Sequence, residues 1–148
     1  MPIQNLTQYL PDFSDGVMAW IILGLRLIWG AILINYSYPM IKTPLSWMDR
    51  KSKPSGFPPF LQLLGAITIF GGGIAIVAGF LTPLAAFGLA IAMFVALALH
   101  LSHGTPFVKP TPDAPGESYD NSLLYFAISL LFVFLGSGTL SLDYLLFG

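Results

Sequence analysis

The sequence predicts an all-α integral membrane protein whose single domain, residues 1–148, forms a bundle of four transmembrane helices. Two observations carry this prediction. Only 9% of the residues are charged and 55% are hydrophobic, whereas soluble domains average about 25% charged residues. In addition, the 42 residues from Phe60 to Leu101 contain no Asp, Glu, Lys or Arg. One bilayer crossing takes about 20 apolar residues, so this stretch is long enough for two.

The central stretch divides into helices expected at about 60–81 and 83–102. Its few polar side chains are Gln62, Thr68, Thr82 and His100. Pro83 marks the division, because proline disfavours helix at the residue before it but fits the first turn of a new helix. The expected arrangement is a transmembrane hairpin with a very short turn.

The two outer helices are expected at about 17–38 and 121–142. Ser14 or Asp15 is a suitable N-cap for the first, and Pro39 is expected to end it. Gly136 and Gly138 loosen the end of the last. The segment before the first helix contains no Lys or Arg, which argues against a cleaved signal peptide.

The basic residues predict the orientation in the membrane. Two polar loops, residues 42–59 and 103–121, separate the first helix from the hairpin and the hairpin from the last helix. They hold every Lys and Arg of the chain except Arg26. By the positive-inside rule these loops face the cytoplasm, and both termini face the other side. The basic residues are Lys42, Arg50, Lys51, Lys53 and Lys109.

The remaining composition excludes several classes of function. A net charge of −1 gives no basis for binding nucleic acid. The absence of cysteine excludes disulfides, thiol redox centres and thiolate metal ligands in this chain. We therefore expect no covalent cofactor. The expected surroundings are the lipid bilayer and other membrane-protein subunits.

A row of small residues in the second helix predicts close helix packing. Gly71, Ala75 and Gly79 recur every four residues, and Gly72 and Gly73 widen the row. Such rows let neighbouring backbones approach closely in lipid. The same space could instead accept a flat ligand such as a quinone ring or a pigment, and the sequence leaves both readings open.

Arg26 is the leading candidate for a ligand-binding residue. It falls near the middle of the first predicted span, where a charge costs about 3 kcal/mol on insertion scales. No acidic residue lies at matching depth, so its expected partners are Thr68, Ser129, helix carbonyls, water or a ligand. Two readings remain: an arginine that snorkels or ties helices together, and a clamp for an anion or a quinone carbonyl.

A second candidate group gathers at the predicted cytoplasmic end. Tyr36, Tyr38, His100 and His103 fall there, and the two histidines share one helical face. They could relay protons to a quinone at headgroup level, or they could be an ordinary interfacial belt. Without a third ligand of suitable spacing, we assign no metal site.

Three segments resemble the DoxX family of small membrane proteins. They are GLRL beginning at Gly24, FGGGIAIVAGFLTPLAA from Phe70 to Ala86, and LGSGTLSLD ending at Asp143. The resemblance implies a four-helix membrane protein of bacterial type, in a cytoplasmic or thylakoid-like membrane. Some relatives are linked to quinone-dependent oxidation of thiosulfate or to membrane redox complexes. Ser141 and Asp143 match the family ending; a purely structural interpretation of them is that Ser141 caps or turns the chain after Gly138 and Asp143 lies in water.

Two departures from the family pattern affect the expected function. Relatives often carry a Tyr-His-Gly type sequence where this chain has Asn35 to Tyr38, and a Glu where it has Ile69. The leading hypothesis is a quinone-linked or redox-associated membrane component; if it is an enzyme, it would be a quinone-dependent oxidoreductase subunit. The alternative, which the departures favour, is an accessory subunit of a respiratory or photosynthetic complex. A transporter ranks last. No catalytic residue is assigned.

Overall fold

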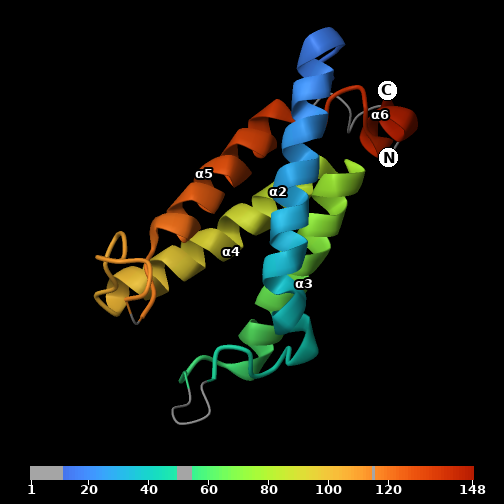
Figure 1. Ribbon diagram of the computed structural model, residues 1–148. Coiled ribbons are helices and arrows are strands. Elements are labelled where there is room, and N and C mark those ends of the chain that lie inside the picture. The colour runs from blue at the N-terminus through green and yellow to red at the C-terminus, as the bar shows by residue number, and fades with distance from the viewer. Residues whose placement is uncertain (1–11, 50–54, 115) are drawn as a thin grey trace.

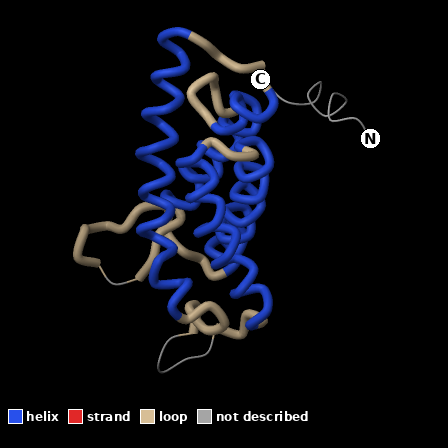
Figure 2. The backbone as a smooth tube through the Cα atoms, turned by 90° about the vertical axis from the view of Figure 1, so that its right-hand side faces the viewer, coloured by secondary structure: helices blue, strands red, loops and turns tan. Residues whose placement is uncertain are grey.

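A computed structural model describes residues 12–49, 55–114 and 116–148. These residues form five helices and contain no strand, so the predicted all-α class is confirmed (Figure 2). Three helices are long and apolar enough to cross a membrane: α2 (Gly16–Lys42), α3 (Pro59–Ala78) and α4 (Thr82–Ser102). The fourth, α5 (Asp120–Leu135), is shorter, and a six-residue helix, α6 (Leu142–Phe147), ends the fold.

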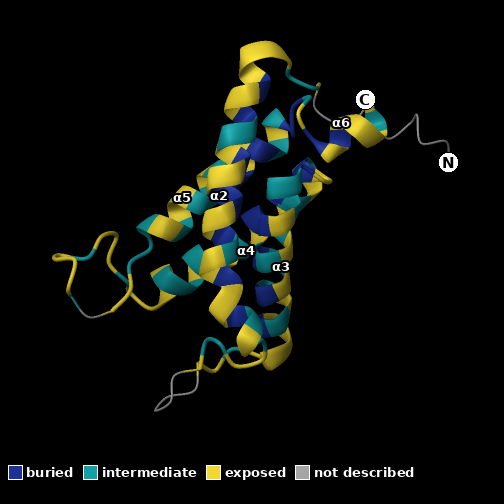
Figure 3. Ribbon diagram, turned by 45° about the vertical axis from the view of Figure 1, so that its right-hand side comes forward, coloured by how far each residue is buried: buried dark blue, intermediate teal, exposed yellow. Residues whose placement is uncertain are grey.

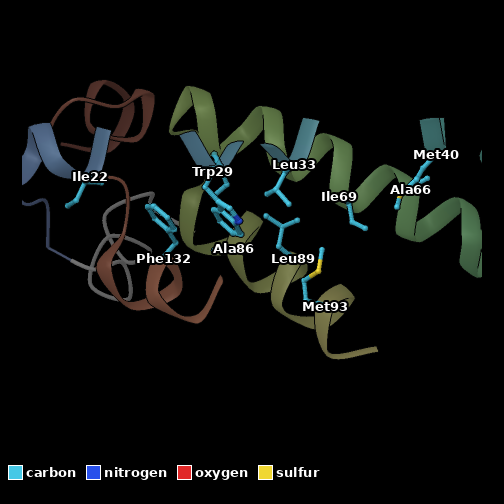
Figure 4. Close-up of a cluster of buried hydrophobic side chains, with 11 residues drawn as sticks. Ile22, Trp29, Leu33, Met40, Ala66, Ile69, Ala86, Leu89, Met93 and Phe132 are labelled. Atoms are coloured by element: carbon cyan, nitrogen blue, oxygen red, sulfur yellow. The ribbon is translucent and has the colours of Figure 1, made fainter. Parts of the chain in front are cut away.

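The four longest helices, α2 to α5, form two pairs that are inclined to each other. α2 packs along α3, α4 packs along α5, and α3 meets α4 near the turn that joins them (Figure 1). α2 and α5 stay further apart and are bridged by large side chains, including the stacked rings of Trp29 and Phe132. Figure 4 shows this bridge within the core that runs from Ile22 to Met40 along α2.

The two ends of the bundle differ in construction. At the end that we call the turn end, residues 79–81 join α3 to α4, and the segment from Gly136 to the C-terminus folds over them. At the opposite end, the loop end, residues 43–58 join α2 to α3 and residues 103–119 join α4 to α5 (Figure 1). The first residues described meet the last segment at the turn end, where the Thr139 amide donates to the Ser14 carbonyl.

Two predicted helix boundaries are wrong. α2 continues through Pro39 to Lys42 instead of ending at proline. Transmembrane helices tolerate internal proline better than soluble ones do, so Pro39 does not end the helix. The last helix ends at Leu135 rather than near residue 142, because Gly136 and Gly138 adopt φ values of 73° and 74°, which a helix does not accommodate.

Candidate functional site

Arg26 is buried at the turn end, with 1% of its surface exposed. Its guanidinium donates four hydrogen bonds to backbone carbonyls. Nε binds the Ile76 oxygen at 2.9 Å, and Nη2 binds the Val77 oxygen at 3.0 Å. Nη1 binds the oxygens of Ser137 and Leu140 at 2.9 and 2.8 Å. One side chain of α2 therefore satisfies the last turn of α3 and the irregular segment after α5.

These contacts explain how irregular backbone is accommodated here. The last carbonyls of a helix have no partner within the helix, and the segment between α5 and α6 makes no helical ladder. In lipid, such groups need partners inside the protein. A guanidinium suits this task because it is a charged group with five N–H donors that point in different directions within one plane.

Asp143 anchors the same turn from the other side. Its carboxylate accepts the backbone N–H of Leu81 at 2.5 Å and that of Thr82 at 2.9 Å, at the start of α4. Its own N–H donates to the Gly79 oxygen at 2.8 Å. A carboxylate at a helix N-terminus is favoured by the free N–H groups and by the helix dipole. It also offsets the cost of Leu81, whose φ of 45° is left-handed.

Gly79 lies between the Arg26 guanidinium and the backbone of the segment that carries Ser141 and Asp143. It ends α3 with a φ of 68°, and its amide donates to the Ile76 carbonyl. A Cβ added there would come within 2.5 Å of Arg26 Nη2 and 2.6 Å of Ser141 Cβ. The position thus requires glycine for its backbone conformation and for its space.

Arg26 lies inside α2 and is level with the end of α3, because α2 continues beyond the α3–α4 turn. Two expectations about this end require correction. Neither Thr68 nor Ser129 is its partner, and Ser129 donates to the Tyr125 carbonyl instead. Asp143 does not lie in water, since only 4% of its surface is exposed.

A groove of about 270 Å³ runs between α2 and α5, where the two helices diverge. Hydrocarbon side chains line most of it, and the lining residues that carry a polar group are Asn121, Tyr125 and Trp29. The Trp29 N–H is buried and has no hydrogen-bond partner among the described residues. The apolar lining residues are Leu25, Ile28, Ile32, Leu124, Ile128, Leu131 and Phe132.

The predicted tyrosine and histidine candidates lie at the loop end but have separate partners. The Tyr36 ring packs edge-on against Tyr125, with centroids 6.4 Å apart, next to the groove. The Lys42 ammonium lies 4.5 Å from the Tyr38 ring centre. His100 Nδ1 is 3.6 Å from a Glu117 carboxylate oxygen, and His103 Nδ1 is 2.7 Å from the Leu99 carbonyl. Within the described ranges, no group of three acidic, histidine or cysteine residues could hold a metal ion.

The glycine row of α3 faces three directions. A Cβ on Gly73 would meet Ile34 and Leu33 of α2 at 3.0–3.1 Å, and one on Gly72 would meet Leu89 of α4 at 2.9 Å. Gly71 has nothing within 4 Å. Together with Gly72, it borders a shallow open groove of about 320 Å³ that also includes Thr68 and Ala75.

Gln62 organises the loop end and was not a candidate from the sequence. Its side chain is fully buried. Its amide oxygen accepts the Met48 N–H at 3.0 Å, and its amide nitrogen donates to the Phe57 carbonyl at 3.0 Å. Its backbone carbonyl accepts the Trp47 indole N–H at 2.7 Å. The sequence feature that could have identified Gln62 is that it is the only amide at the start of a long apolar span. Asp143 could have been identified in a similar way, because it is the only charged side chain after Asp120.

The comparisons with known proteins agree with this architecture. The DoxX family model matches residues 21–102, which is more than half of the chain and includes most of α2 and all of α3 and α4. No curated protein and no solved structure gives a significant match. With its apolar membrane-spanning helices and this match, the chain is a multi-pass membrane protein that belongs to the DoxX family.

Proposed function

We propose that this protein is a quinone-linked membrane component that holds an isoprenoid-quinone type of amphiphile between α2 and α5. The observation that carries the proposal is the groove of about 270 Å³ with apolar walls and polar groups at one end. Ligand sites of this kind are mostly apolar, with a few polar groups that fix orientation. A groove of this size suits a ring and the beginning of its tail.

The distribution of groups along the groove favours one ligand orientation. Asn121 and Tyr125 lie in the first turns of α5, and Tyr36 packs against Tyr125, so the phenols and the amide gather toward the loop end. Leu25 and Leu131 line the opposite part. A quinone carbonyl accepts hydrogen bonds from phenol and amide groups, while its isoprenoid tail prefers hydrocarbon walls.

This proposal gives Arg26 a structural role. The quinone-carbonyl clamp suggested by its sequence position would need donors directed at a ligand. Its four hydrogen bonds instead go to carbonyls of the protein itself. Ligand binding is therefore assigned to the α2–α5 groove, with Tyr36 beside it.

The proposed location is a bacterial-type cytoplasmic or thylakoid-like membrane, with the loop end in the cytoplasm. The support is the positive-inside rule, since Lys42 and Lys109 lie at the loop end and the turn end has no Lys or Arg besides the buried Arg26. A Thr111→Cys variant tests this orientation in intact cells. Impermeant thiol reagents should not label it until the membrane is opened, and labelling of intact cells would reverse the orientation.

The binding proposal is tested by purification in mild detergent, followed by mass spectrometry of extracted lipids and an optical spectrum. We expect quinone near one equivalent per chain. Ile128→Trp should fill the groove and remove the quinone, whereas Ile91→Trp adds the same ring to an exposed position of α4 and should leave it bound. Quinone at the same low level in the unmodified protein, Ile128→Trp and Ile91→Trp would contradict the proposal. A pigment that co-purifies in place of quinone would show that the ligand is the pigment.

A second candidate function is an accessory subunit of a larger membrane complex. It is favoured by α2, which runs for 27 residues, about 40 Å, and presents Val17, Trp20 and Ile28 with 64–77% of their surfaces exposed (Figure 3). Chemical cross-linking in native membranes, with mass spectrometry of the products, tests this candidate. Cross-links from the α2 face to one other membrane protein would support it, and cross-links only between copies of this chain would not.

A further inference from the structure

The short helix α6 has one face fixed to the protein and one face uncovered. Ser141 caps it by accepting the Tyr144 N–H at 3.2 Å, and Asp143 ties it to the first residues of α4. Because Asp143 is buried, the rotation of α6 about its axis is set. Leu145 and Leu146 then point outward, with 78% and 60% of their surfaces exposed.

The depth of α6 in the membrane follows from the α3–α4 turn, with which it makes contact. α3 has 20 residues, or about 30 Å, which equals the thickness of a bilayer's hydrocarbon core, and α4, which is inclined to it, has 21. Their common turn therefore lies at the hydrocarbon boundary. Asp143 N–H bonds to Gly79 in that turn, so α6 is held at the same level.

The surroundings of α6 are apolar as well. Phe80 and Leu84, beside the turn, have 41% and 65% of their surfaces exposed. After Asp120 the chain carries one charge, Asp143, and that charge faces inward. A water-facing helix would expose polar side chains, whereas a helix in the membrane interface exposes large apolar ones. Tyr144, at 43% exposure, is a residue type enriched at that boundary.

We propose that α6 is an interfacial anchor that inserts Leu145 and Leu146 among the lipid headgroups and upper acyl chains at the turn end. The occupant of its outer face is the lipid leaflet. Through Asp143, this anchor holds the α3–α4 turn, and with it the carbonyls that bind Arg26, at a fixed depth in the membrane. The inference is independent of what occupies the α2–α5 groove.

Site-directed spin labelling tests the proposal, and the chain suits it because it contains no native cysteine. Leu145→Cys and Leu146→Cys are labelled with a nitroxide in reconstituted liposomes, and Thr111→Cys in the exposed loop is the control. Collision rates are measured with oxygen, which concentrates in lipid, and with a water-soluble nickel chelate. We expect the nitroxides at positions 145 and 146 to collide more often with oxygen, and the nitroxide at position 111 to collide more often with the nickel chelate.

Two results would overturn the anchor. Nickel access at both α6 positions equal to that at residue 111 would place the helix in water. Low access to both reagents would mean that protein, not lipid, covers this face. Both α6 sites are exposed, so the label should not disturb folding, and an unchanged circular dichroism spectrum checks this.

Discussion

The turn end and the loop end both supply hydrogen-bond partners to backbone groups outside the regular helices, but they use different side chains. At the turn end, Arg26 and Asp143 are charged, buried and bonded to backbone groups from three separate segments. At the loop end, Gln62 does comparable work with a neutral amide, and its partners lie within 15 residues along the chain. The hydrogen bonds of the turn end therefore join segments that are far apart in the sequence, whereas those of the loop end stay within one loop and the helix that follows it.

This difference sets what each end can do. Hydrogen bonds to charged groups are stronger than neutral ones, and leaving buried partners unpaired is costly, so the turn end should be rigid. At the loop end, Tyr36, Tyr38 and His103 are exposed, and His100 pairs with a Glu117 that is 61% exposed. Side chains of this kind can change partners more easily than the buried charges of the turn end.

Arg26→Leu should give the largest effect, because it removes four hydrogen bonds to carbonyls, and of these acceptors only Ile76 keeps a second donor among the described residues, the Gly79 N–H. We expect a loss of more than about 3 kcal/mol in stability, since each unpaired buried group costs about 1–3 kcal/mol. Thermal unfolding in detergent, followed by tryptophan fluorescence, measures it. Arg26→Lys should be intermediate, because one ammonium cannot reach both segments. A stable Arg26→Leu protein would mean that the turn end does not depend on the guanidinium.

Gly79→Ala should be the next most destabilising change. Alanine at a φ of 68° costs about 1–2 kcal/mol, and its Cβ would displace the Arg26 guanidinium. The matched control is Gly71→Ala, which meets nothing within 4 Å and should be neutral or slightly stabilising. Equal melting temperatures for the two variants would contradict the tight packing described around Gly79.

Asp143→Asn should destabilise the protein by about 1.5–2 kcal/mol. The amide keeps the size of the side chain but has one acceptor oxygen for two N–H groups, those of Leu81 and Thr82. Hydrogen exchange at these two amides should quicken more than at amides in the middle of α4. Asp113→Asn, in the exposed α4–α5 loop, serves as the control for a general loss of charge.

Gln62→Leu tests the loop end in the same way, and we expect a smaller loss of about 1 kcal/mol. The variant removes three neutral side-chain hydrogen bonds, to Met48, Phe57 and, at 3.4 Å, Ser55, but it keeps the bond from the Trp47 indole to the backbone carbonyl of residue 62. Thermal unfolding should therefore rank it well below Arg26→Leu. A loss as large as that of Arg26→Leu would remove the distinction between the two ends.

The smallest effect concerns Asp49 in the α2–α3 loop. The Ser55 hydroxyl and N–H donate to its carboxylate at 2.6 and 2.9 Å, and these bonds hold the pKa of Asp49 below its usual range. This contact stabilises the loop above the ordinary pKa of aspartate and is lost as the pH falls through the lowered value. Ser55→Ala should raise the pKa of Asp49 in an NMR titration, while Ser46→Ala should not change it.

Local properties of the sequence were enough to predict most of the fold. Hydropathy located the three long helices, since 20 apolar residues can be read without knowing their neighbours. Pro83 correctly placed the break between α3 and α4, because proline constrains the backbone on its own. The end of α5 was missed, since Gly136 and Gly138 permit a helix break but do not require one.

The polar partnerships were decided by the tertiary structure alone. The sequence named Arg26 as unusual, but its acceptors lie 50 to 114 residues away, and the carbonyl groups that it binds are present in every residue. Asp143 looked like a water-exposed tail residue until the turn of α3 and α4 was placed beside it. Composition and periodicity determine which segments leave water; which buried charge meets which backbone group depends on how those segments pack.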